Sequence, residues 1–328
     1  MIHTFLRSIG FRDLTKNAEL YPVLESILNR PDEQTIVTDE TGNEFACFSK
    51  NFGTDIGIMV CGNFINDKEF RMEYYYPYLH GSQITTNEMI EIERHAGREA
   101  FAGICDELKL GVTLIFYIEN IADVLREKKY ALHGTRGPEN AVLAGLSTGG
   151  KILLPVMKTS KMLANKEKSS EQRLNLMKQA RDGNKGAMEN LTMNDMDLYS
   201  SLSRRVMKED VLSIVESSFI PYGIESDQYV VIGEILNFYE AENNLSNEKL
   251  WILTLNCNNL IFDICINQKD LLGEPEVGRR FKGRIWLQGH VNYGYLFHTV
   301  IHYIKYRAFP VYTDHTKTNT GNALLFLL

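Results

Sequence analysis

The aromatic residues of this chain are absent from one long internal segment. The sequence holds 16 Phe, 16 Tyr and 2 Trp, yet none of them lies between Tyr130 and Tyr199. The stretch Met157–Lys208 instead holds seven of the 11 methionines. Because aromatic side chains contribute the largest buried areas of a core, this distribution predicts two globular parts joined by a helical segment.

The length and charge of the chain agree with that division. A chain of 328 residues exceeds the size at which a single hydrophobic core usually stops growing. Its apolar fraction of 44% and charged fraction of 23% are typical of globular proteins. The formal net charge of −7 argues against a general affinity for nucleic acid.

The cysteines and the start of the chain predict a cytoplasmic protein. The five cysteines occur singly inside apolar runs, without a CxxC pair, at Cys47, Cys61, Cys105, Cys257 and Cys265. This pattern is typical of buried free thiols in a reducing compartment. The first residues lack the features of a signal peptide, and no apolar run approaches the roughly 18 residues of a spanning helix. We therefore expect no membrane association, and no motif indicates a cofactor.

Residues 1–156 are predicted to form an antiparallel α+β domain. Apolar residues recur at helical spacing over 12–30, and a shorter helix is expected near 121–129. Between these helices the period is two, which predicts the strands Thr35–Thr38, Glu44–Ser49, Ile56–Cys61, Phe70–Tyr76, Met89–His95, Ala100–Asp106 and Val112–Glu119. Pro77 is expected to end one of them. A last hairpin is predicted from Ala141–Ala144 and Ile152–Val156.

Residues 157–220 are predicted to form a helical connector. One helix is expected over Glu171–Arg181, and a second is expected to open at a capping box that begins with Thr192. The stripe of the second helix consists of Met196, Tyr199, Leu202 and Val206. The first half of the connector is basic and the second half is acidic, which is typical of a helical hairpin that lies on a domain.

Residues 221–310 are predicted to form a small β-barrel-like domain. Its strands are expected at Gln228–Leu236, Lys249–Cys257, Leu260–Asn267 and Lys282–Gln288, with a two-residue turn at Asn258-Asn259 and a covering helix over Tyr295–Tyr306. The tail, residues 311–328, ends in an apolar run. That run is expected to dock as an added strand, within the chain or on a neighbour, or to fray.

A glycine-rich segment contains two patterns known from enzymes. Gly145-x-Ser147-x-Gly149 matches the nucleophile elbow of hydrolases, and Gly145, Gly150 and Lys151 nearly match the phosphate-binding loop. Both motifs need a helix after the loop, whereas the residues that follow are strand-like. A glycine-rich hairpin turn is therefore the favoured interpretation. An anion loop of Gly145, Ser147, Gly150 and Lys151, or a nucleophilic serine, remains an alternative.

Two histidines have the spacing of metal ligands. His298 and His302 are i and i+4 on the predicted last helix, which suits zinc, and His290 or His315 would be a third ligand. Thr299 stands where a metalloprotease motif has its general base. The alternative is an ordinary amphipathic helix.

The segment 270–283 is the densest cluster of Gly, Pro and charge. Arg279, Arg280 and Lys282 are candidates to bind an anionic ligand, with Glu225 and Asp227 as an acidic pair or as partners of the arginines. The alternative is a long loop whose charges satisfy one another.

The runs Lys208–Tyr229 and Asp270–Gly283, with the N-terminal Phe5–Phe11, carry a family resemblance. The sequence resembles a family of uncharacterised cytoplasmic proteins from clostridia, a domain of unknown function, over residues 1–310. The resemblance implies a soluble protein without an assigned activity, and it brings no catalytic residues to this chain.

Three hypotheses of function follow. The first is a non-enzymatic protein that binds a protein partner or a small anionic ligand, because no nucleophile, base and orienting group share one context. The second is a hydrolase or phosphate-handling enzyme that uses the 145–151 segment or His298 and His302. The third is nucleic-acid binding through the basic half of the connector, which lacks an aromatic residue to stack on a base.

Overall fold

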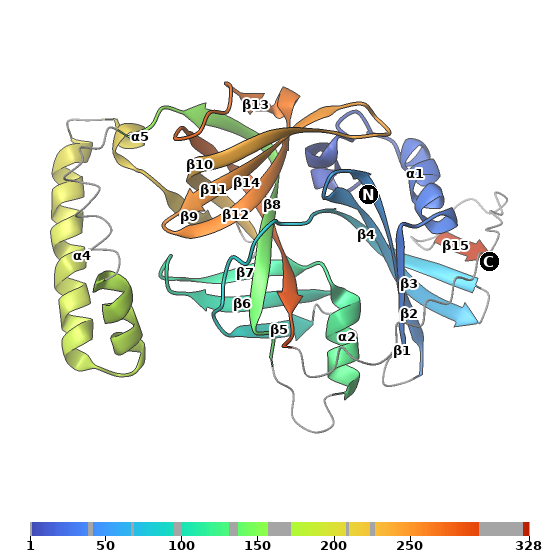
Figure 1. The fold of residues 1–328 in the computed structure, drawn as a ribbon, viewed down its shortest axis with the longest axis horizontal. Helices are drawn as coiled ribbons and strands as arrows, with labels where there is room; N and C mark the ends of the chain where they lie inside the picture. Colours follow the sequence, from blue (N-terminus) through green and yellow to red (C-terminus); the bar gives the residue numbers. More distant parts are fainter. Residues whose placement is uncertain are drawn as a thin grey trace.

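Two β-sheets make up most of the structure (Figure 1). The computed structural model describes residues 2–38, 42–66, 69–94, 100–130, 137–156, 172–207, 210–223, 227–294 and 324–327. Sheet A has five strands in the order β1-β2-β3-β4-β15, and sheet B has ten. The predicted α+β class, with an antiparallel sheet and a barrel-like part, is confirmed.

Sheet A is antiparallel throughout and lies near the N-terminal helices η1 (Thr4–Ile9) and α1 (Asn17–Asn29). Its strands are β1 (Glu33–Thr38), β2 (Glu44–Gly53), β3 (Ile56–Asn66), β4 (Glu69–Leu79) and β15 (Leu324–Leu327). The apolar C-terminal run therefore adds a strand within its own chain, as one of its predicted alternatives required.

The prediction that Pro77 ends β4 is wrong. The strand continues to Leu79, with Pro77 opposite Ile58 of β3. The carbonyl of Pro77 accepts a hydrogen bond from Nε2 of Gln288, which lies in sheet B, at 2.7 Å. The N and C=O of one residue point to the same side of a strand, so the proline nitrogen faces away from β3. The missing N–H therefore costs no bond to β3.

Sheet B contains a closed five-stranded barrel. Its strands are β5 (Ile90–Arg94), β6 (Phe101–Glu107), β7 (Val112–Ile118), β8 (Asn140–Leu153), β9 (Ser218–Pro221), β10 (Gln228–Glu242), β11 (Lys249–Cys257), β12 (Leu260–Asn267), β13 (Leu271–Leu272) and β14 (Arg280–Asn292), with α2 (Ile121–Tyr130) after β7. Strand β8 pairs in parallel with β12 and antiparallel with β14, which closes the ring β8-β12-β11-β10-β14. Strand β14 continues beyond the ring and pairs with β7.

The turn between β11 and β12 confirms the sequence prediction. Asn258 and Asn259 have φ values of 52° and 68°. Positive φ at both central residues is the geometry of a type I′ turn, which matches the twist of the two strands and favours asparagine.

The predicted glycine-rich hairpin is wrong, because β8 is one continuous strand. Its glycines make room inside the barrel. A Cβ on Gly150 would lie 2.3 Å from Cε2 of Phe281, and a Cβ on Gly283 would lie 2.4 Å from Cζ of the same ring. Since Gly150 and Gly283 are opposite each other on β8 and β14, the fully buried ring of Phe281 occupies the space that two side chains would otherwise fill.

The helical connector stands apart from the sheets at the left of Figure 1. It contains a helix over 172–181, α4 (Lys185–Val206) and α5 (Val211–Ile214). The predicted capping box at Thr192 is wrong: Thr192 lies inside α4, and its Oγ1 donates to the Met188 carbonyl at 2.9 Å. The cap belongs to Asn184, whose Oδ1 accepts from the N–H of Ala187.

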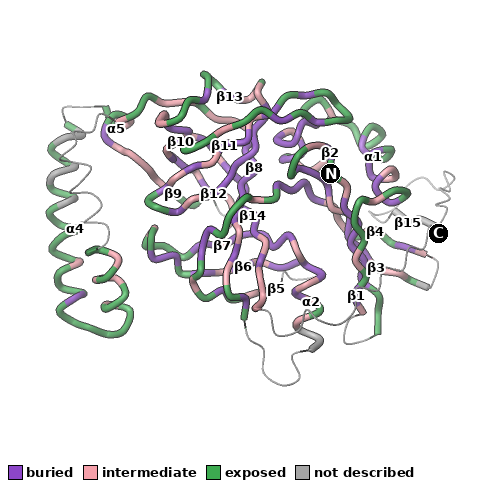
Figure 2. Tube along the Cα trace, in the orientation of Figure 1, coloured by how far each residue is buried: buried purple, intermediate pink, exposed green. Residues whose placement is uncertain are grey.

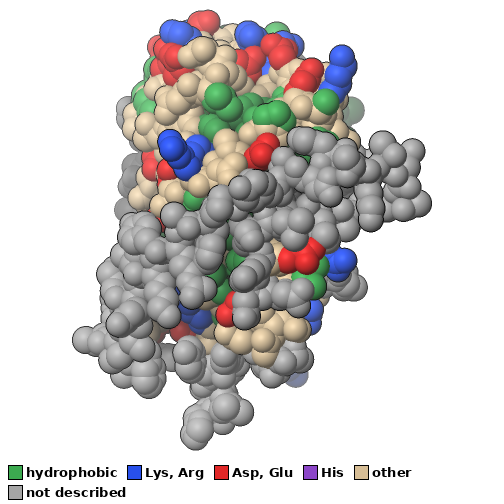
Figure 3. Space-filling model, turned by 90° about the vertical axis from the view of Figure 1, so that its right-hand side faces the viewer, with side chains coloured by type: hydrophobic (Ala, Val, Ile, Leu, Met, Phe, Trp, Pro, Cys, Tyr) green, Lys and Arg blue, Asp and Glu red, His purple; other side chains and the backbone are tan. Residues whose placement is uncertain are grey.

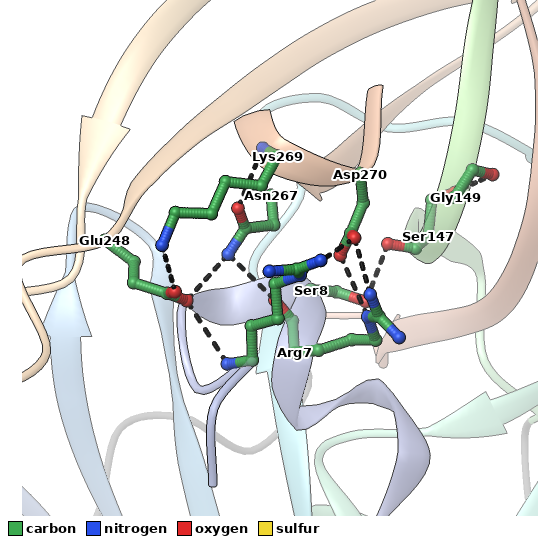
Figure 4. Close-up of polar contacts among 9 residues, drawn as sticks. Arg7, Ser8, Ser147, Gly149, Glu248, Asn267, Lys269 and Asp270 are labelled. Atoms are coloured by element: carbon green, nitrogen blue, oxygen red, sulfur yellow. Dashed lines mark hydrogen bonds and ion pairs between the residues drawn. The ribbon is translucent and has the colours of Figure 1, made fainter. Parts of the chain in front are cut away.

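A polar junction joins η1 to the barrel (Figure 4). Asp270, which lies in the short 3₁₀ turn η3 (Gln268–Asp270), receives two hydrogen bonds from the guanidinium of Arg7, at 2.9 and 2.5 Å, and one from Arg12 at 3.1 Å. The hydrogen bond to Asp270 raises the pKa of Arg7. Beside it, Glu248 accepts from Asn267 and from Lys269. The buried carboxylates of Asp270 and Glu248 are thus each paired with a cation, which offsets the free-energy cost of burying their charge.

The buried apolar side chains form one continuous cluster from Phe5 to Val291. The buried residues along both sheets are coloured purple in Figure 2. Strand β8 falls within the predicted domain 1–156, yet its partner strands β12, β13 and β14 all follow residue 259. The division into domains at residues 156 and 220 stays a prediction. The helix over Tyr295–Tyr306 lies outside the described residues and also stays a prediction. Among the described helices, none is long and apolar enough to span a membrane.

Substitution of Gly150 by alanine is expected to destabilise the barrel. The added methyl would overlap the Phe281 ring, and overpacking of a core typically costs about 1–3 kcal/mol. Gly149→Ala is the matched control, because the nearest atom to its added Cβ is 3.9 Å away. The measurement is the free energy of unfolding in urea. Equal stability of the two variants would contradict the packing role of Gly150.

Loss of the Asp270 carboxylate is expected to loosen the attachment of η1. Asp270→Ala removes three charged hydrogen bonds from a buried acceptor, and such bonds contribute about 1.5–3 kcal/mol each at most. Glu240→Ala is the control, because its ion pair with Lys249 lies in solvent and should contribute less. Urea denaturation compares the two, and a larger loss of stability for Glu240→Ala would argue against the junction.

Candidate functional site

The glycine-rich segment offers neither an exposed nucleophile nor an anion loop. Ser147 has no exposed surface, and its Oγ lies 2.9 Å from the carbonyl oxygen of Arg284 and 3.2 Å from that of Gly149. Both motifs require a loop that leads into a helix, whereas Gly145, Ser147, Gly150 and Lys151 all lie within β8. This geometry differs from the one that either chemistry needs.

Arg279 and Arg280 are engaged with the protein itself. Arg280 is 5% exposed, and its guanidinium donates to the carbonyls of Leu154, Leu212 and Val215. Burial lowers the pKa of Arg280. Arg279 forms an ion pair with Glu276. Arg280 therefore holds the end of β8 and the α5 segment against the barrel, and we do not propose it as a ligand donor.

The other predicted site residues are dispersed. Asp227 accepts the indole N–H of Trp286 at 2.8 Å. Glu225, His298 and His302 lie outside the described residues. Within the described part of the chain, no three His, Cys, Asp or Glu side chains are grouped so that they could hold a metal ion.

The structure does bring two predicted residues together, Lys151 and Lys282. They are directly opposite each other in the antiparallel ladder of β8 and β14, so their Cβ atoms are about 5 Å apart on one face. Arg284 is two residues further along β14 and therefore lies on the same face. This face is the outside of the barrel, because Phe281 and Gly283 alternate with these residues and point inward.

We call Lys151, Lys282 and Arg284 the basic stripe. The guanidinium carbon of Arg284 lies 4.7 Å from the ring centre of Tyr222, which is a cation–π contact. None of the three cations has an ion pair with a carboxylate among the described residues. Gly149, opposite Arg284, adds no side chain to this face, and the nearest atom to its missing Cβ is the carbonyl oxygen of Asp270 at 3.9 Å. The arrangement can receive an anion.

A small cleft of about 230 Å³ is lined in part by Arg280. Its polar lining comes from Glu216, Ser217, Glu234, Asn256, Asn258 and Asn259. Two carboxylates and no exposed cation make this cleft unsuitable for an anion. The stripe and the cleft are therefore chemically distinct parts of the same end of the barrel.

The sequence analysis missed Arg284 and Tyr222. A signal was present, because the cations at 280, 282 and 284 alternate with apolar or small residues at a period of two, which places them on one face of a strand. The contact between Arg284 and Tyr222 had no signal in the sequence, because strands β10 to β13 lie between these two residues.

The face of the molecule in Figure 3 carries charges of both signs. On the side that carries α1 and β15, basic and acidic side chains are interspersed around a few apolar ones where the surface is described (Figure 3). Charges of mixed sign do not create a field that favours one kind of ion. The basic stripe is therefore the candidate that the geometry supports.

A further charged pair, which the sequence analysis did not predict, lies between sheet A and sheet B. Nδ1 of His80, at the end of β4, is 3.2 Å from Oε2 of Glu119, which is buried after β7. The imidazole also stacks on Tyr78, with ring centres 4.4 Å apart. Burial acts to lower the pKa of His80, but the hydrogen bond and the charge of Glu119 outweigh it, so that pKa is raised.

The pair between His80 and Glu119 is expected to make stability depend on pH. Because the folded pKa of His80 is raised, its stabilising contribution is complete below the unfolded value of about 6.5 and is lost as the pH rises through the folded pKa. Urea titrations from acidic to alkaline pH should therefore show that His80→Gln and Glu119→Gln lose most stability, relative to wild type, on the acidic side. A difference that does not change with pH would exclude this linkage.

The comparison with known proteins identifies a family. Residues 6–289 match the family described as a domain of unknown function from an E. rectale gene, DUF3881. No curated protein and no solved structure matches the chain. The match covers sheet A apart from β15, sheet B up to Gly289 of β14, and the connector, and it confirms the resemblance expected from the sequence. The chain therefore belongs to this clostridial family of unknown function.

Proposed function

We propose that this protein is a non-enzymatic binding protein whose ligand is anionic and binds to the basic stripe. The observation that carries the proposal is the direct opposition of Lys151 and Lys282 across β8 and β14. Like charges at opposed positions of a sheet are destabilising. An anion placed between the two ammonium groups would turn this repulsion into two favourable contacts.

Arg284 and Tyr222 support a ligand that carries phosphate. A guanidinium presents donors in a planar fork that matches two phosphate oxygens, whereas an ammonium acts as a point charge. The contact with Tyr222 restricts the Arg284 side chain before binding, and such pre-ordering lowers the entropy lost on association. Two lysines and one oriented arginine thus suit a small phosphorylated or pyrophosphate-like ligand.

We also propose a cytoplasmic location, which the cysteines support. All five cysteines are free and buried. Burial raises the pKa of Cys257 and Cys105 to about 12, so their thiols stay protonated and react slowly with oxidants. Such thiols are typical of a reducing compartment.

Neutralising the stripe is expected to weaken anion binding. We predict that Lys151→Gln combined with Lys282→Gln weakens the binding of inorganic pyrophosphate, measured by calorimetry, by at least about tenfold, which is roughly 1.4 kcal/mol. Arg284→Gln alone should weaken it less, because the two lysines remain. The same variants should elute from heparin at lower salt.

The matched control removes the same charge elsewhere. Lys178→Gln combined with Lys185→Gln takes two cations from the basic half of the connector, so both double variants have a net charge of −7 − 2 = −9. The control should bind pyrophosphate and heparin like wild type. If wild type binds neither probe, or if the connector variant loses as much as the stripe variant, the stripe is not the site. The second result would favour the connector as the anion-binding surface.

A further inference from the structure

Two of the five cysteines face each other across neighbouring strands of sheet A. Cys47 of β2 and Cys61 of β3 are directly opposite in the antiparallel ladder, and their Sγ atoms are 3.2 Å apart. Both side chains are buried. The spacing of the cysteines in the sequence does not indicate this pair, because the register of β2 and β3 creates it.

The geometry of the pair suits a disulfide bond. Opposed residues of antiparallel strands have Cα atoms about 4.5–5.5 Å apart, and a disulfide spans roughly 4.4–6.8 Å between Cα atoms. Because an S–S bond is about 2.05 Å long, the sulfur atoms of Cys47 and Cys61 need to approach by only about 1 Å from their present separation. The bond can therefore form while the two strands stay paired.

The other three cysteines lack a sulfur partner among the described residues. Sγ of Cys257 donates to the carbonyl oxygen of Ile232 at 3.3 Å, and Sγ of Cys265 donates to that of Ser8 at 3.0 Å. Cys105 lies in β6, and neither β5 nor β7, the strands paired with it, contains a cysteine. These three thiols are therefore internal references, equally buried but without a second sulfur to bond.

The two sulfur atoms of the pair differ in their surroundings. Burial, together with the hydrogen bond to Cys47, raises the pKa of Cys61, and Cys61 has no exposed surface. Cys47 is 6% exposed and lies opposite Thr35 of β1, the strand at the edge of sheet A. A small oxidant that enters from this edge reaches Cys47 first, and Cys61 is positioned to complete the bond.

We propose that Cys47 and Cys61 form a reversible disulfide when the protein meets a hydroperoxide. The Cys47 sulfur attacks one peroxide oxygen, the O–O bond breaks, and the second oxygen takes the thiol proton and leaves as water or an alcohol. The sulfur of Cys61 then attacks the sulfenic acid of Cys47. This step forms the S–S bond, and the hydroxyl leaves with the Cys61 proton as water. The thiols lose two electrons, which reduce the peroxide.

A thiol reductant reverses the bond by thiol–disulfide exchange. Disulfides in a reducing compartment are usually transient and redox-sensing, which agrees with the proposed cytoplasmic location. The site contains no residue of the basic stripe, so it stands or falls independently of the proposed anion binding.

A thiol count on the native full chain tests the proposal. The protein is treated with hydrogen peroxide and then denatured, and its free thiols are titrated. We expect wild type to lose two of its five free thiols and about 2 Da of mass, because two hydrogen atoms leave. Dithiothreitol should restore both values. A proteolytic digest of the oxidised protein should contain the peptides of Cys47 and Cys61 joined by a disulfide, a result that needs no variant.

Two variants show which thiols react. Cys257→Ala is the matched control, because it removes a buried thiol that bonds a backbone carbonyl, and it should still lose two thiols. Cys61→Ala should form no disulfide, and dimedone should trap the sulfenic acid that remains on Cys47. The proposal is overturned if wild type keeps all five thiols, if the digest joins a different pair, or if Cys61→Ala also loses two thiols.

Discussion

The ladder between β8 and β14 is the interaction on which the rest of the structure depends. It runs from Leu153 opposite Arg280 to Asn140 opposite Asn292 and closes the barrel. One end of β14 reaches β7 and sheet A through Gln288, whose Nε2 binds the carbonyl of Pro77. The other end carries the basic stripe. A single pair of strands, far apart in sequence, therefore positions both the core and the candidate site.

The elements that local patterns determine could be predicted from the sequence. The bounds of β11 and β12 agree with the prediction because the apolar period of two is interrupted only by Asn258 and Asn259, residues that tolerate positive φ. Each signal lies within a few residues of the structure that it specifies. The family resemblance correctly predicted the family to which the chain belongs. It predicted no function, because the family itself is described without one.

Predictions failed where a distant residue determines the local structure. Gly150 has the pattern of a turn, yet it is a strand residue because the ring of Phe281 needs the space of its missing side chain. Thr192 has the pattern of a helix cap, yet Asn184 caps α4. Pro77 stays in its strand because its nitrogen faces away from β3. No local pattern contains these partners, so the candidate site could not be assembled before the strands were paired.

Strand β14 shows why a count of cations does not locate a binding site. Arg280, Lys282 and Arg284 occupy every second position of β14 and therefore lie on the same outer face. The α5 segment covers Arg280, so its donors hold backbone carbonyls and it acts as a structural clamp. The α5 segment does not hold Lys282 or Arg284, and Lys151 lies opposite Lys282. All three residues are cations, so charge does not distinguish the clamp from the residues able to bind a ligand. The difference is whether another segment of the protein covers the side chain, and the fold determines that.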